Sequence, residues 1–281
     1  MKLRSTTIML HYKFMIVAFF VCLLLGASIP LIGSNAVYKR LSSSGDALAH
    51  SSLAGVAIGL ASGLNPLWTS ILACIVSCLI IEILRKRFNK FSELGVAVVL
   101  SASIGLAGIL SSFTKASNFD SYLFGSILLI SDTELYLTIG LAAVIFVFSF
   151  VFYSHNFSSL YSESEARVSG IKVGALTFAS NLLLSISVAL GAKVVGSLVI
   201  SSLIVLPSAI ALQFKKGYKF TLISSSIIGI ITMSVGLTIA YYCDLKPGAT
   251  MVIVAVGLLI IVFIYRYLKT MIDKTKTIKK I

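Results

Sequence analysis

The hydrophobic positions of the chain form long runs that are interrupted by short polar or charged stretches. Runs of roughly 17–25 apolar residues are long enough to cross a membrane as helices. An additional, shorter apolar stretch at 122–131 favours a re-entrant or interfacial segment. The pattern predicts an all-α polytopic membrane protein of about nine transmembrane helices, with eight to ten compatible, in a single domain over residues 1–281. The predicted spans are 14–38, 46–63, 66–84, 94–112, 134–153, 173–190, 194–212, 220–241 and 248–265.

The composition agrees with this pattern. Hydrophobic residues make up 58% of the chain and charged residues only 12%, and the mean hydropathy is +1.02. A soluble globular domain contains about 25% charged residues, so the composition excludes that class. The net charge of +13 resides in short loops between apolar runs. This distribution is typical of residues that set membrane topology and predicts no nucleic-acid partner.

The same basic residues orient the chain. If the N-terminus lies outside the cell, 17 of the 23 lysines and arginines fall on the cytoplasmic side, and the opposite orientation reverses this bias. Cytoplasmic loops of membrane proteins are enriched in these residues. We therefore predict a multi-pass protein of the cell membrane with an outside N-terminus and a cytoplasmic C-terminus.

The stretch 42–60 contains the strongest candidate for chemistry. Asp46 and His50 lie four residues apart at the start of an apolar helix. An ionisable residue in a spanning helix costs about 2.5–3.5 kcal/mol on insertion scales, and it usually marks a pathway. Spacing of i, i+4 places both side chains on one helix face, where a carboxylate and an imidazole can share one divalent cation. The alternatives are that Asp46 caps the helix and that His50 is a hydrogen-bonded packing residue.

Glycines on a neighbouring face of the same helix predict close packing. Gly55, Gly59 and Gly63 form two overlapping GxxxG patterns, which allow another backbone to approach closely.

A second row of metal-ligand residues is formed by Cys74, Cys78 and Glu82, again at i, i+4 spacing. Cysteine is commonly a small buried hydrophobic residue, and we favour that interpretation over a soft metal site.

The longest polar interruption is the loop 161–174, which charge placement assigns to the cytoplasm. Its residues Glu165, Ala166 and Gly170 resemble the coupling segment of ABC importer permeases, in which a short helix docks on the ATPase. The chain has no GxxxxGK[ST] and no HExxH sequence, which argues against ATP binding by a P-loop and against an intramembrane metalloprotease. We expect a transport subunit and no enzyme.

Five stretches, in this order, resemble the permease subunit of the zinc/manganese ABC importer family. They are GDALAHSSLAGVAIGL (45–60), SYLFGSILLIS (121–131), EARVSGI (165–171), VVGSLVISSLIVLPSAIA (194–211) and DLKPGAT (244–250). In that family the aspartate and histidine of the first stretch are associated with the metal path. The resemblance implies a membrane homodimer, separate cytoplasmic ATPase subunits and an extracytoplasmic metal-binding protein. It also implies transported Zn²⁺ or Mn²⁺ and no permanently bound cofactor.

Two other functions stay open on the residues alone. A permease for a metal chelate, such as a siderophore or cobalamin, needs a wide pathway and no chelating pair. A proton-coupled secondary transporter would use Asp46 and His50 as a proton relay and would work without an ATPase.

Overall fold

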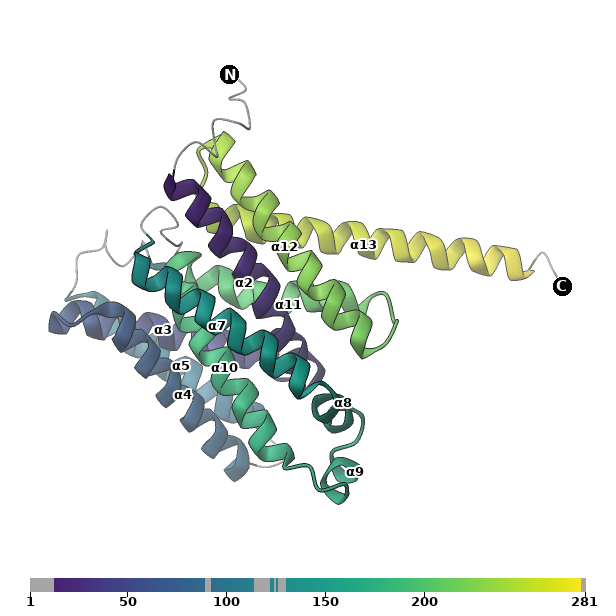
Figure 1. Cartoon of the computed structure of the whole chain (residues 1–281), viewed down its shortest axis with the longest axis horizontal. Coiled ribbons are helices and arrows are strands. Elements are labelled where there is room, and N and C mark those ends of the chain that lie inside the picture. Colours follow the sequence, from purple (N-terminus) through teal and green to yellow (C-terminus); the bar gives the residue numbers. More distant parts are fainter. Residues whose placement is uncertain (1–12, 89–91, 114–121, 124, 126–129, 279–281) are drawn as a thin grey trace.

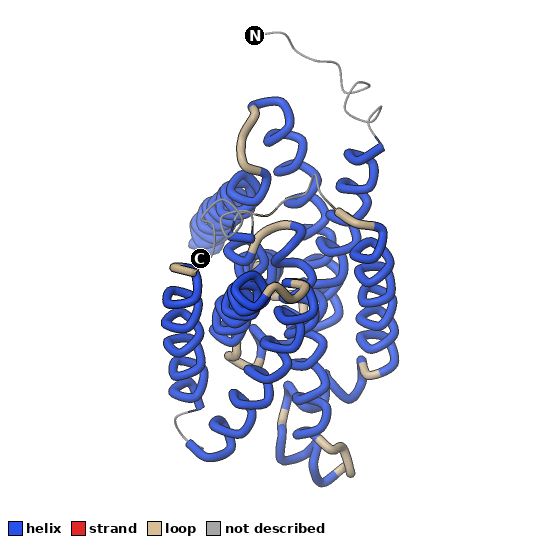
Figure 2. The backbone as a smooth tube through the Cα atoms, turned by 90° about the vertical axis from the view of Figure 1, so that its left-hand side faces the viewer, coloured by secondary structure: helices blue, strands red, loops and turns tan. Residues whose placement is uncertain are grey.

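The computed structural model describes residues 13–88, 92–113, 122–123, 125 and 130–278. Figure 2 shows these residues as helices joined by loops, with no strand among them. Inside a membrane no water is available to the backbone, and a helix satisfies its N–H and C=O groups within one segment. An apolar chain of this kind therefore folds as helices.

Each long helix of the described residues overlaps one of the predicted apolar stretches, and two short helices, α8 and α9, follow α7. The bounds are α2 (Lys13–Tyr38), α3 (Ser42–Ser62), α4 (Pro66–Phe88), α5 (Ser92–Ser111), α7 (Asp132–Val151), α8 (Tyr153–Tyr161), α9 (Glu163–Val168), α10 (Val173–Val194), α11 (Ser197–Leu212), α12 (Tyr218–Cys243) and α13 (Pro247–Ile278).

Seven helices of the described chain, rather than nine, are long and apolar enough to cross a membrane on their own. The two others are α3 and α11. Helix α3 has 21 residues, but six serines, Asp46 and His50 reduce its apolar character. In α11 the apolar part, Val199–Leu212, is short. Most of α3 is buried by its neighbours, and a helix that neighbours shield from lipid has less need of an apolar surface.

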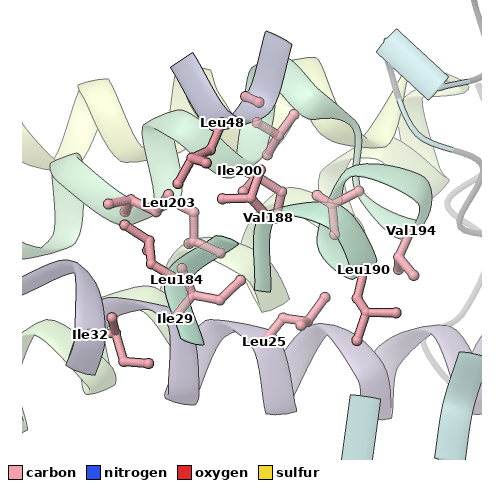
Figure 3. Close-up of a cluster of buried hydrophobic side chains, with 14 of the residues drawn as sticks. Leu25, Ile29, Ile32, Leu48, Leu184, Val188, Leu190, Val194, Ile200 and Leu203 are labelled. Atoms are coloured by element: carbon pink, nitrogen blue, oxygen red, sulfur yellow. The ribbon is translucent and has the colours of Figure 1, made fainter. Parts of the chain in front are cut away.

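One part of the hydrophobic core lies where α2, α3, α10 and α11 meet (Figure 3). Helix α3 contributes Leu48, which is 1% exposed, together with Ala47 and Ala49. One face of α3 is thereby held inside the bundle. The other labelled side chains of this cluster are Leu25, Ile29, Ile32, Leu184, Val188, Leu190, Val194, Ile200 and Leu203.

Helices α8 and α9 lie at the end of the bundle that is opposite to the N-terminus (Figure 1). The turn between α2 and α3 belongs to the same region, since α2 descends from the N-terminal end. Half of the expected short segment at 122–131, residues 124 and 126–129, falls outside the described residues. Of its described part, Tyr122 and Leu123 pack against Leu53, Ala54 and Ala107.

Candidate functional site on helix α3

Helix α3 begins at Ser42, so Asp46 lies in its second turn. The N-cap residue is Leu41, and no side chain makes a capping hydrogen bond there. The alternative that Asp46 caps the helix is therefore wrong. The predicted start at residue 46 was one turn late, because Ser42, Ser43 and Ser44 resemble a loop in sequence although Ser44 is buried.

Asp46 and His50 lie on a strip of α3 that the rest of the described chain leaves open. Asp46 is exposed and His50 is partly exposed, whereas the intervening residues Ala47, Leu48 and Ala49 are buried. Neither side chain has a hydrogen-bond or ion-pair partner among the described residues. No cluster of three or more His, Cys, Asp or Glu residues occurs in this part of the chain either. Within the described residues this strip therefore presents two possible metal-binding side chains, fewer than the four ligands of a typical structural Zn²⁺ site.

The remaining faces of α3 are fixed by polar contacts with its neighbours. The Ser51 hydroxyl is 2.8 Å from that of Ser103 on α5. The Ser52 hydroxyl is 2.9 Å from that of Ser70 on α4. On a third side, a Cβ at Gly45 would lie 3.1 Å from the Ile204 side chain of α11. These contacts set the rotation of α3 about its axis and so direct the open strip away from the bundle.

The predicted packing glycines behave differently from one another. A Cβ at Gly55 would lie 2.7 Å from atoms of Thr69, Ser70 and Ala73 on α4, and one at Gly59 would lie 2.4 Å from the Thr69 hydroxyl. Gly63 does not pack, because a Cβ there would meet nothing within 4 Å. It is instead the C-cap of α3, with a φ of 71°, a conformation that glycine adopts without steric cost.

Substituting Gly55 by leucine should prevent α3 from lying against α4. Overpacking of a well-packed interior typically costs about 1–3 kcal/mol, and here backbone atoms would have to move. We expect a lower thermal unfolding midpoint in detergent before any change in ion preference. Gly108→Leu on α5, where a Cβ meets open space, is the control. A Gly55→Leu protein as stable as this control would contradict the packing role.

The polar loop contains a well-defined short helix, α9. The Ser162 hydroxyl caps it by accepting the Glu165 N–H at 3.3 Å. Gly170 ends it, with a φ of 82°, and the N–H groups of Gly170 and Ile171 donate to the carbonyls of Arg167 and Ala166. This is the Schellman arrangement that often terminates helices. The short helix therefore ends at Gly170.

Only one side chain of α9 is buried. Ala166 is 2% exposed, Glu165 is exposed, and Val168 is 90% exposed. The helix is therefore seated on the bundle through Ala166 and presents its other sides outwards.

The row of Cys74, Cys78 and Glu82 does not form a metal site within the described residues. Both cysteines are buried, and the Cys74 thiol donates to the Leu48 carbonyl at 3.4 Å. Glu82 is engaged by Arg85 at 3.2 Å and by Lys86 at 3.7 Å. Cys74 thus joins α4 to α3, and Glu82 pairs with two basic residues in the last turn of α4.

Sequence reasoning missed two lysines with specific partners. The ammonium group of Lys193 on α10 pairs with the buried carboxylate of Glu134 on α7. The Lys39 Nζ, in the turn before α3, donates to the Thr177 hydroxyl of α10 at 2.5 Å. Each lysine stands beside an apolar run in the sequence, and that position was the available signal.

The chain is similar in sequence to known membrane transport proteins. The model of the ABC 3 transport family matches residues 11–266. A "Probable metal transport system membrane protein" of Treponema pallidum is 36% identical and covers 90% of this chain and 96% of its own length. The "Manganese transport system membrane protein MntC" of Listeria monocytogenes is 27% identical, with 92% of each chain covered. The "High-affinity zinc uptake system membrane protein ZnuB" of Buchnera aphidicola is 26% identical over 79% of this chain and 86% of its own.

A solved structure, PsaBC from Streptococcus pneumoniae in complex with Fab, has the same fold. Its matching chain superposes with a TM-score of 0.79 at 24% identity, over 91% of this chain and 92% of that one.

Proposed function

The chain belongs to the ABC 3 transport family, and from this premise we propose that it is the membrane permease subunit of an ATP-driven importer of Zn²⁺ or Mn²⁺. The observation that carries the proposal is the position of Asp46 and His50 on the open strip of α3. Relatives named for manganese and for zinc transport support the choice of ions. Hydrolysis of ATP is assigned to a separate subunit.

The metal site is proposed to form between two copies of the chain. A symmetric dimer presents the same residues twice, and it would supply two carboxylates and two imidazoles. Four such donors suit tetrahedral Zn²⁺ at roughly 2.0–2.2 Å, and added waters would suit Mn²⁺. The open strip of α3 is compatible with this arrangement, because a site buried by its own chain could not be shared. An extracytoplasmic binding protein would deliver the ion to it.

The topology is proposed to have nine spans, with α3 and α11 shielded by the other helices. The N-terminus then lies outside, and α9 and the C-terminus lie in the cytoplasm. Reporter fusions at both termini test this assignment, and a cytoplasmic N-terminus would exclude it.

Uptake of free ions by the reconstituted complex tests the function. Proteoliposomes that contain this chain, with its ATPase subunits on the luminal side, should accumulate ⁶⁵Zn²⁺ or ⁵⁴Mn²⁺. They should do so only when ATP is enclosed in the lumen. Uptake driven by a proton gradient without ATP would favour a secondary transporter. Uptake of a siderophore or cobalamin complex, with none of the free ion, would favour a chelate permease.

The loop 161–174 is proposed as the ATPase contact, through Glu165 and the exposed sides of α9. Replacing Gly170 by valine should abolish stimulation of ATP hydrolysis while membrane insertion stays intact. A side chain at a left-handed φ costs about 1–2 kcal/mol, which is enough to unwind the end of a six-residue helix. The measurement is ATPase activity of the complex. Gly174→Val is the control, because Gly174 is exposed in the first turn of α10 and has ordinary backbone angles. Equal activities of the two variants would contradict the proposal.

A further inference from the structure

The turn between α2 and α3 is short and held by backbone hydrogen bonds. Helix α2 ends in hydrogen bonds from Arg40 N–H to the Val37 carbonyl and from Leu41 N–H to the Ala36 carbonyl, at 3.0 and 2.8 Å. Arg40 adopts a left-handed φ of 57°, and Leu41 is already the N-cap of α3. A displacement of Lys39 is therefore passed directly to the start of the helix that bears Asp46 and His50.

Lys39 joins this turn to the helix that follows α9. Its Nζ donates to the hydroxyl of Thr177 at 2.5 Å, and Thr177 is 5% exposed in the second turn of α10. Only residues 169–172 separate α9 from α10, and they are held by the hydrogen bonds that end α9. Short, hydrogen-bonded connections thus lead from α9 through Thr177 and Lys39 to α3.

The charges around Lys39 come from several elements. Burial lowers the pKa of the Lys39 ammonium below its usual range, Glu163 on α9 raises it, Arg85 on α4 lowers it, and Glu82 on α4 raises it. The Lys39 ammonium is thus sensitive to the position of α9 itself, because Glu163 acts on it across the gap between the two elements. Lysine side chains usually extend their ammonium group into water, whereas the ammonium group of Lys39 is partly buried.

We infer that Lys39 is a positioning residue that links the ATPase-docking helix α9 to the metal-binding pair on α3. When α9 moves with the ATPase, the Lys39–Thr177 contact displaces the α2–α3 turn and, with it, Asp46 and His50. This inference rests on the proposed function, since it assigns to that same site the route by which ATP hydrolysis reaches it.

The test compares variants in the reconstituted complex with ATPase subunits and ⁶⁵Zn²⁺ or ⁵⁴Mn²⁺. In Lys39→Gln and in Thr177→Val, the number of ions moved per ATP hydrolysed should fall between about five- and 150-fold, the usual range of coupling between sites. Because the two residues act through one contact, the double variant should be no worse than the single ones. Binding of the metal ion to the purified permease should keep its affinity, and the ATPase should still copurify.

Arg40→Asn is the matched control, since it removes an exposed charge from the same turn and asparagine tolerates a left-handed φ. A wild-type ratio of ions to ATP in both Lys39→Gln and Thr177→Val would overturn the inference. So would an equal fall in Arg40→Asn, which would show an effect of charge on topology alone. If Lys39→Gln fails to fold, Thr177→Val decides. If the wild-type complex moves no metal ion, the proposed function fails and the inference falls with it.

Discussion

Replacing either Asp46 or His50 by alanine should abolish uptake of Zn²⁺ or Mn²⁺ while protein level and ATPase association stay unchanged. Removing a mere outer-shell partner of a metal ligand typically costs about 10–100-fold, and loss of a ligand itself should cost at least as much. In a dimer each substitution removes two donors at once. Both side chains lie on the open strip of α3, so neither truncation leaves a cavity in the core. Uptake of the radioactive ion in a deletion strain measures the effect.

The control for this prediction is Ser43→Ala, one turn before Asp46 on the same exposed strip. It should transport normally, because its hydroxyl is no required ligand. Asp46→Asn separates charge from shape, since the amide keeps the size of the carboxylate and binds divalent ions more weakly. Wild-type uptake in Asp46→Ala and His50→Ala would reduce both residues to surface positions of a packing helix, and the proposed metal site would be wrong.

The positions of most helices along the chain could be predicted from sequence, because the apolar runs have a length that the membrane fixes. Local hydropathy failed where a polar residue is satisfied by a distant one. A break was predicted at residues 191–193, yet α10 continues to Val194, since Glu134 neutralises Lys193. The burial of Ser44 beneath neighbouring helices is likewise invisible in a run of three serines. The partner of Lys193 lies 59 residues away in the chain, beyond the reach of a local pattern.

For the candidate site, too, local spacing predicts some features and distant contacts determine others. Spacing alone predicts that Asp46 and His50 share a helix face, because i, i+4 geometry is local. Spacing cannot say that this face is open while Leu48, between them, enters the core. That fact depends on the contacts of Ser51 and Ser52 with α5 and α4. Gly63 continues the four-residue spacing of Gly55 and Gly59 in the sequence. Helix α3 ends at Gly63, however, so this glycine forms the C-cap and does not pack against a neighbouring helix.

Breaking the Glu134–Lys193 pair should strongly destabilise the protein. The Glu134 side chain is only 4% exposed and that of Lys193 is 30% exposed. The other Glu134 oxygen accepts the Ser131 N–H at 3.0 Å and completes the capping box of α7. Removing one partner of a fully buried ion pair costs about 3–5 kcal/mol, and the partial exposure of Lys193 puts the cost here at or below the lower end of that range. Glu134→Gln isolates this cost, because glutamine preserves a capping box.

Thermal unfolding of the detergent-solubilised protein measures this effect. Glu134→Gln should lower the midpoint strongly, and adding Lys193→Met should restore much of it, since a buried pair replaced by uncharged residues of similar size is often neutral. Glu163→Gln is the control, because its pair with Arg167 is exposed on both sides and such pairs contribute at most about 1 kcal/mol. If Glu134→Gln has the same unfolding midpoint as this control, the Glu134–Lys193 pair is solvated and contributes little to stability. If the double variant is worse than Glu134→Gln, Lys193 holds α10 against α7 through its packing as well as its charge.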